Sequence, residues 1–224
     1  MKLPSSFKES PWDSAVFGVP SYAITAISAQ SLAVAERVPG HYTVRVEPLA
    51  SKQSLHEHGF YYCDTLLEPY CTAQRFCAFD ATDVGMDRDA SLEALLAICH
   101  GAFSHGRFHR DFNLAGVQAD QRYDNWLGQL HSAGKVYGLM YQGELAGFIA
   151  VDGNRLVLHA IAAALRGRGL AKILWTPICR ALFEQGCNEL VSSVSASNLA
   201  VMNLYATLGF RFRNPVDLYH RLTK

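Results

Sequence analysis

The chain has 224 residues, half of them hydrophobic, so it is long enough to bury a full core as one large domain or two small ones. Lysine plus arginine and aspartate plus glutamate both number 20, and no long run of either sign occurs. This balance argues against a surface that wraps nucleic acid or lies on an anionic membrane, and any anion site must be local.

The N-terminal residues MKLPSSFKES lack the apolar core of a signal peptide, and the longest apolar runs, such as LVLHAIAAAL, fall short of a membrane span. The six cysteines form no CxxC pair and no metal-ligand spacing. We therefore expect a soluble cytoplasmic protein with free thiols, without a metal, without membrane insertion and without a nucleic-acid partner.

The first 80 residues contain a segment whose sequence resembles that of the C-terminal end. HEHGFYYCDTLLEPY resembles YATLGFRFRNPVDLY when Gly59-Phe60 is set beside Gly209-Phe210, and a strand pattern precedes each segment. We infer a degenerate half-copy of a strand-helix-strand unit, although so short a resemblance also arises by chance. The acidic, turn-rich FDATDVGMD predicts a boundary between a domain at 1–80 and a domain at 81–224.

Helical periodicity begins after this boundary. SLEALLAICHGAF (91–103) and ADQRYDNWLGQLHSAG (119–134) carry apolar residues at helical spacing, and Gly134 ends the second helix. The pattern then alternates and is broken by QGE (142–144) and DGN (152–154). These turn signals predict three consecutive antiparallel strands within 135–162.

The remaining residues predict alternating helices and strands. Apolar residues at helical spacing predict a helix over 170–186, which Pro177 should distort. The pattern then predicts a strand at 188–196, a helix at 197–210 and two strands at 210–213 and 217–222.

The connection AALRGRGLAKIL, between a predicted strand and a predicted helix, has the composition of a phosphate-binding loop. Gly167 and Gly169 let successive amides point at one anion, and the helix that follows offers its positive end. Arg166 and Arg168 would add charge-assisted hydrogen bonds. The alternative is a tight strand-to-helix connection with solvated arginines.

Two motifs in this order resemble the GNAT family of N-acetyltransferases. The family's acyl-CoA loop, Arg/Gln-x-x-Gly-x-Gly/Ala, is filled by Arg166, Gly169 and Ala171. The later signature, Asn-x-x-Ala-x-x-x-Tyr-x-x-x-Gly-Phe, is similar to NLAVMNLYATLGF, which begins at Asn198 and has valine in place of the alanine. The resemblance covers about residues 88–222.

The resemblance implies an α/β (α+β) fold with a mixed, mostly antiparallel sheet that splays at the acyl-CoA site, here preceded by a truncated GNAT-like half. It implies acetyl-CoA as cosubstrate and no metal. The residues it places at the cofactor are His159, Ala160, Ile161, Arg166, Gly167, Arg168, Gly169, Leu170, Ala171 and Asn198.

The resemblance also implies that Tyr205 is catalytic and protonates the departing CoA sulfur, because a phenol with an ordinary pKa of about 10 is matched to a forming thiolate. The alternative is that Tyr205 only packs a helix face beside Phe210. No general base is evident. His159 would serve if it faces the cleft, but a histidine in an apolar strand also suits a structural role, and a water chain to a carboxylate remains open.

A finer resemblance lies outside the CoA motifs. PWDSAVFGVPS and AFSHGRFHRDFNL are similar to segments of the dTDP-fucosamine acetyltransferases, which acetylate a nucleotide-linked amino sugar. Aromatic faces, a cation for a diphosphate and a carboxylate for an ammonium suit such a substrate. The substrate-binding candidates are Arg107, Phe108, Asp111, Tyr123 and Trp126. Alternatively, Phe108, Tyr123 and Trp126 close the core between the first two helices of this domain, while Arg107 and Asp111 form a surface pair.

The expectation from sequence is therefore an acetyl-CoA-dependent N-acetyltransferase that acts on a dTDP-4-amino-4,6-dideoxyhexose for surface polysaccharide synthesis. The alternatives are a GNAT enzyme that acetylates a protein N-terminus, a polyamine or an antibiotic, and a non-catalytic CoA-binding module. Exposed strand edges in this architecture also allow a homodimer.

Overall fold

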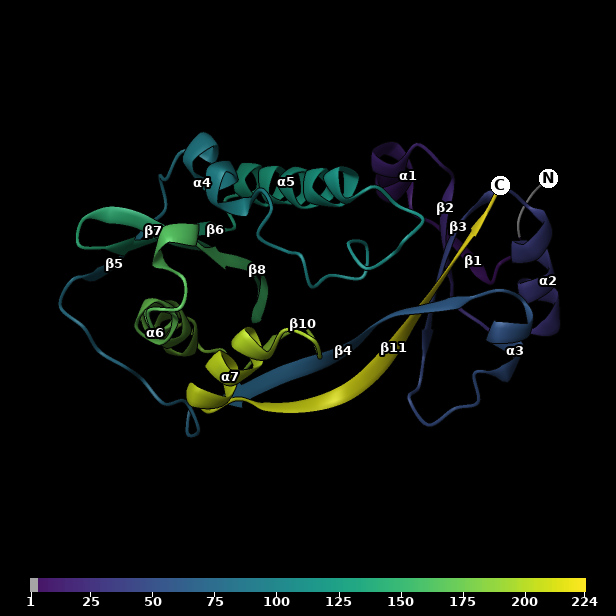
Figure 1. Cartoon of the computed structure of the whole chain (residues 1–224). Coiled ribbons are helices and arrows are strands. Elements are labelled where there is room, and N and C mark those ends of the chain that lie inside the picture. The colour runs from purple at the N-terminus through teal and green to yellow at the C-terminus, as the bar shows by residue number, and fades with distance from the viewer. Residues whose placement is uncertain (1–3) are drawn as a thin grey trace. The chain divides into compact units, whose positions relative to one another are not determined.

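The computed structural model describes residues 4–224, and the chain divides into two compact units (Figure 1). Unit 1 comprises the chain up to Leu66 together with Ser104–Arg122 and Pro215–Lys224, and unit 2 comprises Leu67–Phe103 and Tyr123–Asn214. The limits of these two units do not coincide with the predicted boundary between residues 80 and 81. That boundary concerns the two halves of the sequence and stays a prediction.

Unit 1 is a sheet with helices packed on it. Its own elements are β1 (Phe7–Glu9), α1 (Pro11–Phe17), β2 (Ser21–Ile24), α2 (Ala29–Arg37), β3 (Gly40–Val46) and α3 (Gln53–Glu57). Strands β4 (Tyr61–Thr72) and β11 (Arg211–Thr223) and helix α5 (Gly116–Ser132) each contribute residues to both units. The sheet order is β1-β2-β3-β11, with β2 and β3 parallel and the other neighbours antiparallel.

Alternate residues of β3 serve different parts of the unit 1 core, as expected for a strand with period two. Tyr42 and Val44 pack in a cluster with Leu32 of α2 and Leu55 of α3. His41, which precedes Tyr42 in the chain, lies instead beside Phe17 of α1, with ring centroids 6.1 Å apart.

Unit 2 contains a set of strands packed with two pairs of helices. Its elements are β5 (Val84–Asp87), α4 (Leu92–Cys99), β6 (Val136–Tyr141), β7 (Glu144–Asp152), β8 (Arg155–Ile161), the 3-10 turn η1 (Ala163–Leu165), α6 (Ala171–Glu184), β9 (Glu189–Ser192), β10 (Val194–Ser195) and α7 (Leu199–Thr207). The strand order is β4-β9-β8-β7-β6-β5. Helices α4 and α5 pack with one hydrophobic cluster of the sheet, and α6 and α7 pack with another.

The structure confirms the predicted helices as α4, α5, α6 and α7 and the predicted meander as β6, β7 and β8. The strand assignments at 210–213 and 217–222 are confirmed, but the predicted break between them is wrong, because β11 runs through both. Asn214 takes a left-handed conformation with φ of 50° beside Pro215, so the strand absorbs the proline without ending. Within residues 4–224, no helix has both the length and the apolar character needed to cross a membrane.

The two segments with similar sequences, around Gly59-Phe60 and Gly209-Phe210, share a local geometry. Gly59 follows α3 and Gly209 follows α7, with left-handed φ of 69° and 87°. The amide of the next residue, Phe60 or Phe210, donates a 2.9 Å hydrogen bond to the carbonyl five residues earlier in each case. Both phenylalanines are buried. The two helix ends are thus built alike, with Leu55 at the place that corresponds to Tyr205.

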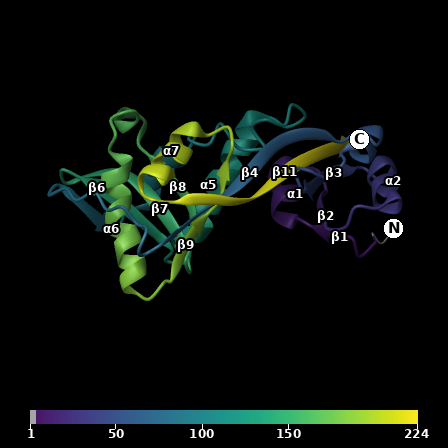
Figure 2. The ribbon, with the colours of Figure 1, turned by 90° about the horizontal axis from the view of Figure 1, so that it is seen from below.

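The last strand of each half of the sequence pairs with a strand of the other half. β4, which follows α3, pairs antiparallel with β9, whereas β11, which follows α7, pairs antiparallel with β3. Figure 2 shows β4 and β11 as long neighbouring strands, consistent with the strand order. The paired strands of each unit therefore come from both halves of the sequence.

Candidate active site

A fork between β8 and β9 opens the sheet of unit 2. The two parallel strands pair at Arg155 with Val191 and at Leu156 with Ser192, and the pairing ends there. β8 continues to Ile161 and is paired along that length with β7. The predicted splay is confirmed, and the edge of β8 that faces away from β7 offers backbone groups to an extended ligand.

An exposed glycine loop leads from β8 into α6. Gly167 and Gly169 have left-handed φ of 74° and 73°, and both are exposed. No side chain caps the N-terminus of α6, so its first amides are not satisfied in the usual way. Arg166 donates from Nε to the Ile161 carbonyl at 2.9 Å, which ties the loop to the end of β8. This geometry suits an anion, while the cofactor role of residues 166–171 stays a prediction.

Tyr205 lies at the base of the fork with its side chain fully buried. Its ring packs on Phe210 with centroids 4.8 Å apart, as the packing alternative required. Its hydroxyl lies 2.8 Å from Nε2 of His159 on β8 and donates to Oγ of Ser192 on β9 at 2.9 Å. Burial raises the pKa of Tyr205, although the bond to Ser192 opposes the rise, so the phenol holds its proton at neutral pH.

His159 approaches Tyr205 from β8, whereas Ser192 approaches it from β9. Its ring stands edge-on to Trp175 of α6, with centroids 5.1 Å apart. Burial lowers the pKa of His159 to about 4, so the imidazole is neutral at physiological pH. Ala160 and Ile161 follow it along β8 and are partly buried.

Asn198, the remaining cofactor candidate, is the N-cap of α7. Its Oδ1 accepts a hydrogen bond from the amide of Val201 at 3.2 Å. The cap fixes the start of the helix that carries Tyr205. Its side-chain NH₂ group is the part suited to a carbonyl of the cofactor, and this contact stays a prediction.

The five substrate candidates fall in different units. Arg107, Phe108 and Asp111 belong to unit 1, and Tyr123 and Trp126 belong to unit 2.

Phe108 is 1% exposed and packs on Phe17, with ring centroids 5.1 Å apart. The guanidinium groups of Arg107 and Arg122 lie 4.6 and 4.4 Å from its ring centroid. Phe108 is thus a core residue of unit 1, and Arg107 lies against its ring.

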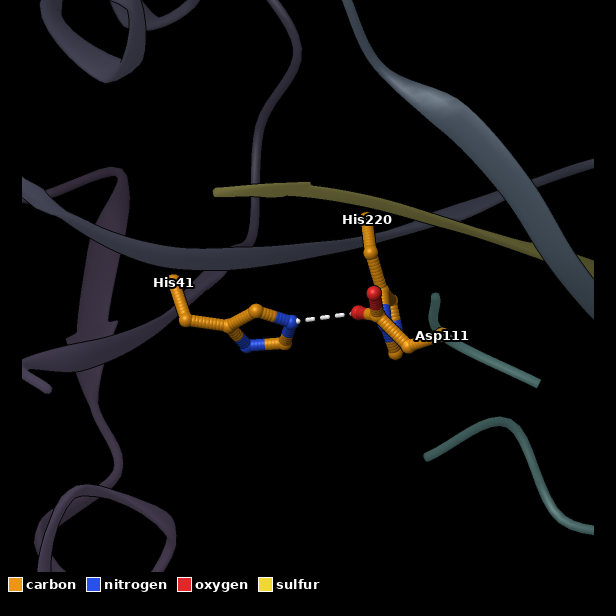
Figure 3. A group of neighbouring side chains, drawn as sticks. All are labelled: His41, Asp111 and His220. Carbon is orange, nitrogen blue, oxygen red and sulfur yellow. Dashed lines mark hydrogen bonds and ion pairs between the residues drawn. The ribbon is translucent and has the colours of Figure 1, made fainter. Parts of the chain in front are cut away.

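Asp111 is buried at the centre of a hydrogen-bonded cluster in unit 1 (Figure 3). Its Oδ2 lies 2.9 Å from Nε2 of His41 and 2.8 Å from Nδ1 of His220. Its Oδ1 accepts bonds of 2.9 Å from the Tyr61 hydroxyl and from the Asn113 amide. Burial opposes the carboxylate, but the bonds from His220, His41 and Asn113 outweigh it and lower the pKa of Asp111.

His41, Asp111 and His220 are also residue types that bind metals, and one ligand atom from each lies within 4.8 Å of the others. Both rings, however, approach the same carboxylate oxygen at hydrogen-bond distance, while its second oxygen is engaged by Tyr61 and Asn113. Nε2 of His220 has no hydrogen-bond partner among residues 4–224, whereas a metal-bound histidine usually donates from its second nitrogen. The arrangement is that of a proton-bridged cluster.

Tyr123 and Trp126 lie on α5, half-buried against the hydrophobic cluster formed with α4. The ring of Tyr123 stacks on Phe103, with centroids 4.4 Å apart and an interplanar angle of 20°. Both residues thus contribute to packing in unit 2. A substrate role for the five candidates stays a prediction.

Residues 101–210 match the sequence model of the acetyltransferase (GNAT) family. This segment is a GNAT acetyltransferase domain. It includes β8, the glycine loop, α6 and α7, and hence the whole fork with Tyr205. The chain is therefore an N-acetyltransferase with the GNAT fold, and acetyl-CoA is the cosubstrate that the family uses generally.

Solved structures share the fold at low sequence identity. A GCN5-related N-acetyltransferase from Sphaerobacter thermophilus superposes with a TM-score of 0.63 at 13% identity, covering 91% of this chain and 72% of that chain. A functionally unknown conserved protein from Staphylococcus epidermidis gives 0.63 at 9% identity, covering 100% and 94%. A tandem GNAT protein from the clavulanic acid biosynthesis pathway gives 0.56 at 12% identity, covering 92% and 76%. No curated protein sequence matches the chain.

The sequence did not indicate the partners of Tyr205 and Asp111. Ser192 lies inside a strand with an ordinary apolar pattern, and His41 and His220 lie in opposite halves of the chain. Their proximity arises only when the sheets form, so no local spacing would have found them.

Proposed function

We propose that this GNAT enzyme transfers the acetyl group of acetyl-CoA directly to the amine of a nucleotide-linked amino sugar of the dTDP-4-amino-4,6-dideoxyhexose type, in the cytoplasm, for surface polysaccharide synthesis. The observation that carries the proposal is the position of the Tyr205 hydroxyl, bonded to residues of both β8 and β9 where these strands part.

Acetyl-CoA binding is assigned to the glycine loop and the free edge of β8. The amides of residues 167–171 and the positive end of α6 suit the pyrophosphate, with Arg166 and Arg168 adding positive charge. The pantetheine arm would pair with the backbone of His159–Ile161 like an added strand. The NH₂ group of Asn198 would bind a carbonyl of the same arm.

The chemistry is direct transfer. The neutral amine attacks the thioester carbonyl, a backbone amide of β8 stabilises the developing oxyanion, and the carbon–sulfur bond breaks. Tyr205 gives its proton to the departing sulfur. Because burial keeps the phenol protonated, this proton is available whenever the thiolate forms.

The substrate class rests on the two segments that resemble the dTDP-fucosamine acetyltransferases. In unit 1 these segments pack together, since Phe17 of the first contacts Phe108 of the second. Asp13 of the first also binds Arg122, four residues before Trp126 in the chain, at 2.7 Å. The resemblance thus covers residues that form one local structure.

The test is a substrate screen. The enzyme is incubated with acetyl-CoA and dTDP-4-amino-4,6-dideoxygalactose, with thiol release followed over time and the product identified by mass. Spermidine, a peptide with a free N-terminus and kanamycin serve as competing amines. Preferred acetylation of the nucleotide sugar is expected. Preference for another amine would overturn the substrate assignment, and acetyl-CoA binding without thiol release for every amine would overturn the catalytic one.

A further inference from the structure

Three consecutive hydrogen bonds connect the two strands of the fork. Nε2 of His159 and the Tyr205 hydroxyl are 2.8 Å apart, Tyr205 donates to Ser192 at 2.9 Å, and Ser192 donates to the Leu156 carbonyl at 2.7 Å. Tyr205, Ser192 and Leu156 are buried, so water does not compete for these bonds.

The carbonyl at the end of this series of hydrogen bonds determines which group donates in each of the three bonds. The Leu156 oxygen only accepts, so the proton of Ser192 points at it, and Ser192 in turn accepts the proton of Tyr205. Tyr205 has no second proton, and therefore Nε2 of His159 is the donor in the first bond. A neutral imidazole that is protonated at Nε2 carries its basic lone pair on Nδ1.

We propose that His159 and Tyr205 form one proton relay that carries the proton of the attacking amine to the CoA sulfur, with Ser192 as the positioning residue that sets its direction. The proposal rests on the proposed role of Tyr205 as proton donor, and it supplies the general base that the sequence left open.

The relay balances without any other reactant. A carbon–nitrogen bond forms, the carbon–sulfur bond breaks, and the amine nitrogen passes one proton to Nδ1 of His159. Nε2 of His159 passes its proton to the Tyr205 oxygen as the Tyr205 proton turns from Ser192 to the thiolate. The amine loses one proton, the sulfur gains one, and both side chains end neutral. Proton exchange with water restores the starting tautomer of His159.

Other contacts of His159 support the relay. Its edge-on packing against Trp175 and Tyr205, at 5.1 and 5.7 Å between centroids, holds the ring in one orientation. The ring is partly rather than fully exposed, and burial lowers the pKa of His159 to about 4. At neutral pH the imidazole is thus neutral, so with its proton on Nε2 its Nδ1 can accept a proton.

The first test reads the tautomer of His159 directly and requires no amine substrate. In protein labelled with ¹⁵N-histidine, the His159 signals are assigned by their loss in His159→Gln. The expected spectrum at pH 7 shows a proton on Nε2 and an unprotonated Nδ1. Ser192→Ala frees the Tyr205 proton to point at Nε2, so the tautomer should invert. A proton on Nδ1 in the wild type, or no inversion in Ser192→Ala, would overturn the relay.

The second test is kinetic, with dTDP-4-amino-4,6-dideoxygalactose as the amine. His159→Gln keeps an N–H donor near the position of Nε2 but has no second ring nitrogen, so kcat should fall about 100-fold or more while acetyl-CoA affinity is unchanged. His100→Gln is the matched control, because His100 is an exposed histidine of unit 2 paired with Asp124. It should keep wild-type kcat.

The kinetic outcomes separate the relay from the proposed function. If His159→Gln keeps wild-type kcat while Tyr205→Phe loses it, the relay is wrong and Tyr205 still acts as the acid. If the wild type does not acetylate this amine, the substrate assignment fails, and the tautomer measurement still decides the direction of the relay.

Discussion

The hydroxyl of Tyr205 lies 2.8 Å from Nε2 of His159 where β8 and β9 separate, although the two residues belong to different elements far apart in the chain. Because the Tyr205 side chain is fully buried, the thioester must reach its hydroxyl through the fork. Position, burial and protonation state therefore make Tyr205 the first residue to test.

Replacing Tyr205 by Phe removes the hydroxyl and preserves the ring that packs on Phe210. Because only the proton donor is lost, kcat should fall by about two to four powers of ten. Acetyl-CoA affinity, measured by calorimetry, should stay unchanged. Wild-type kcat in Tyr205→Phe would contradict the role of proton donor.

The glycine loop can be tested through its backbone. Gly169 has a φ of 73° that a β-branched residue rarely adopts, so Gly169→Val should distort the loop and raise the KM for acetyl-CoA about tenfold or more. Gly153, with φ of 60° in the turn between β7 and β8, is the matched control. Gly153→Val should lower the melting temperature without raising this KM. Equal KM effects at both positions would argue against the cofactor role of the loop.

Much of the fold could be predicted from local patterns. The turns at residues 142–144 and 152–154 and the helical spacing over α6 depend on neighbours in sequence, and these elements form as predicted. The glycine loop was predictable for the same reason.

Other features depend on residues that only the tertiary fold brings together. Asn214 and Pro215 resemble a strand end, yet β11 runs through them between its neighbours β3 and β4. Phe108 and Asp111 offer suitable chemistry for a substrate, but their contacts with Phe17 and His41 could not be read from sequence spacing.

Asp111→Asn tests whether this residue is structural. An amide cannot accept all four hydrogen bonds that the carboxylate receives, so the free energy of unfolding should fall by roughly 3–5 kcal/mol. Asp120→Asn, which loosens an ion pair with His109 in the same unit, should cost less than about 1 kcal/mol. Urea titration measures both. An unchanged stability with a raised KM for the amine would assign Asp111 to substrate binding instead.

Stability should fall as the pH is lowered. Burial lowers the pKa of His220 in the folded protein to about 4 from 6.5, even though Asp111 pulls it upward. Between these values the unfolded chain binds a proton that folded His220 does not bind, so acid favours unfolding. From pH 7 to pH 5 this single group should cost about 2 kcal/mol. His159, with a folded pKa of about 4, adds a loss of the same sign.

The variant that isolates this effect is His220→Asn. Its side-chain NH₂ group replaces the donor at Nδ1 and does not titrate, so the free energy of unfolding should depend less steeply on pH than in the wild type. Denaturant unfolding at pH 7 and pH 5 gives the two slopes. Identical slopes would show that His220 is not held neutral by the fold.

The corresponding glycines of the two halves should differ in their tolerance of alanine. A Cβ at Gly209 would lie 2.0 Å from the backbone oxygen of Arg75, whereas at Gly59 it would meet a side-chain atom, Nη1 of Arg221, rather than backbone. With backbone strain included, Gly209→Ala should destabilise by roughly 3 kcal/mol and Gly59→Ala by about 1 kcal/mol. Thermal unfolding of the two variants compares them, and equal losses would show that the Arg75 contact yields easily.

The exchange of final strands has a consequence for synthesis on the ribosome. β3 is made early, but its partner β11 emerges only after every other described strand. The N-terminal strands therefore wait with an open edge until β11 emerges, a state in which nascent chains pair wrongly with one another. Emergence of β11, rather than of the N-terminal half, is then the event that permits correct folding, and holding chaperones should matter most before it.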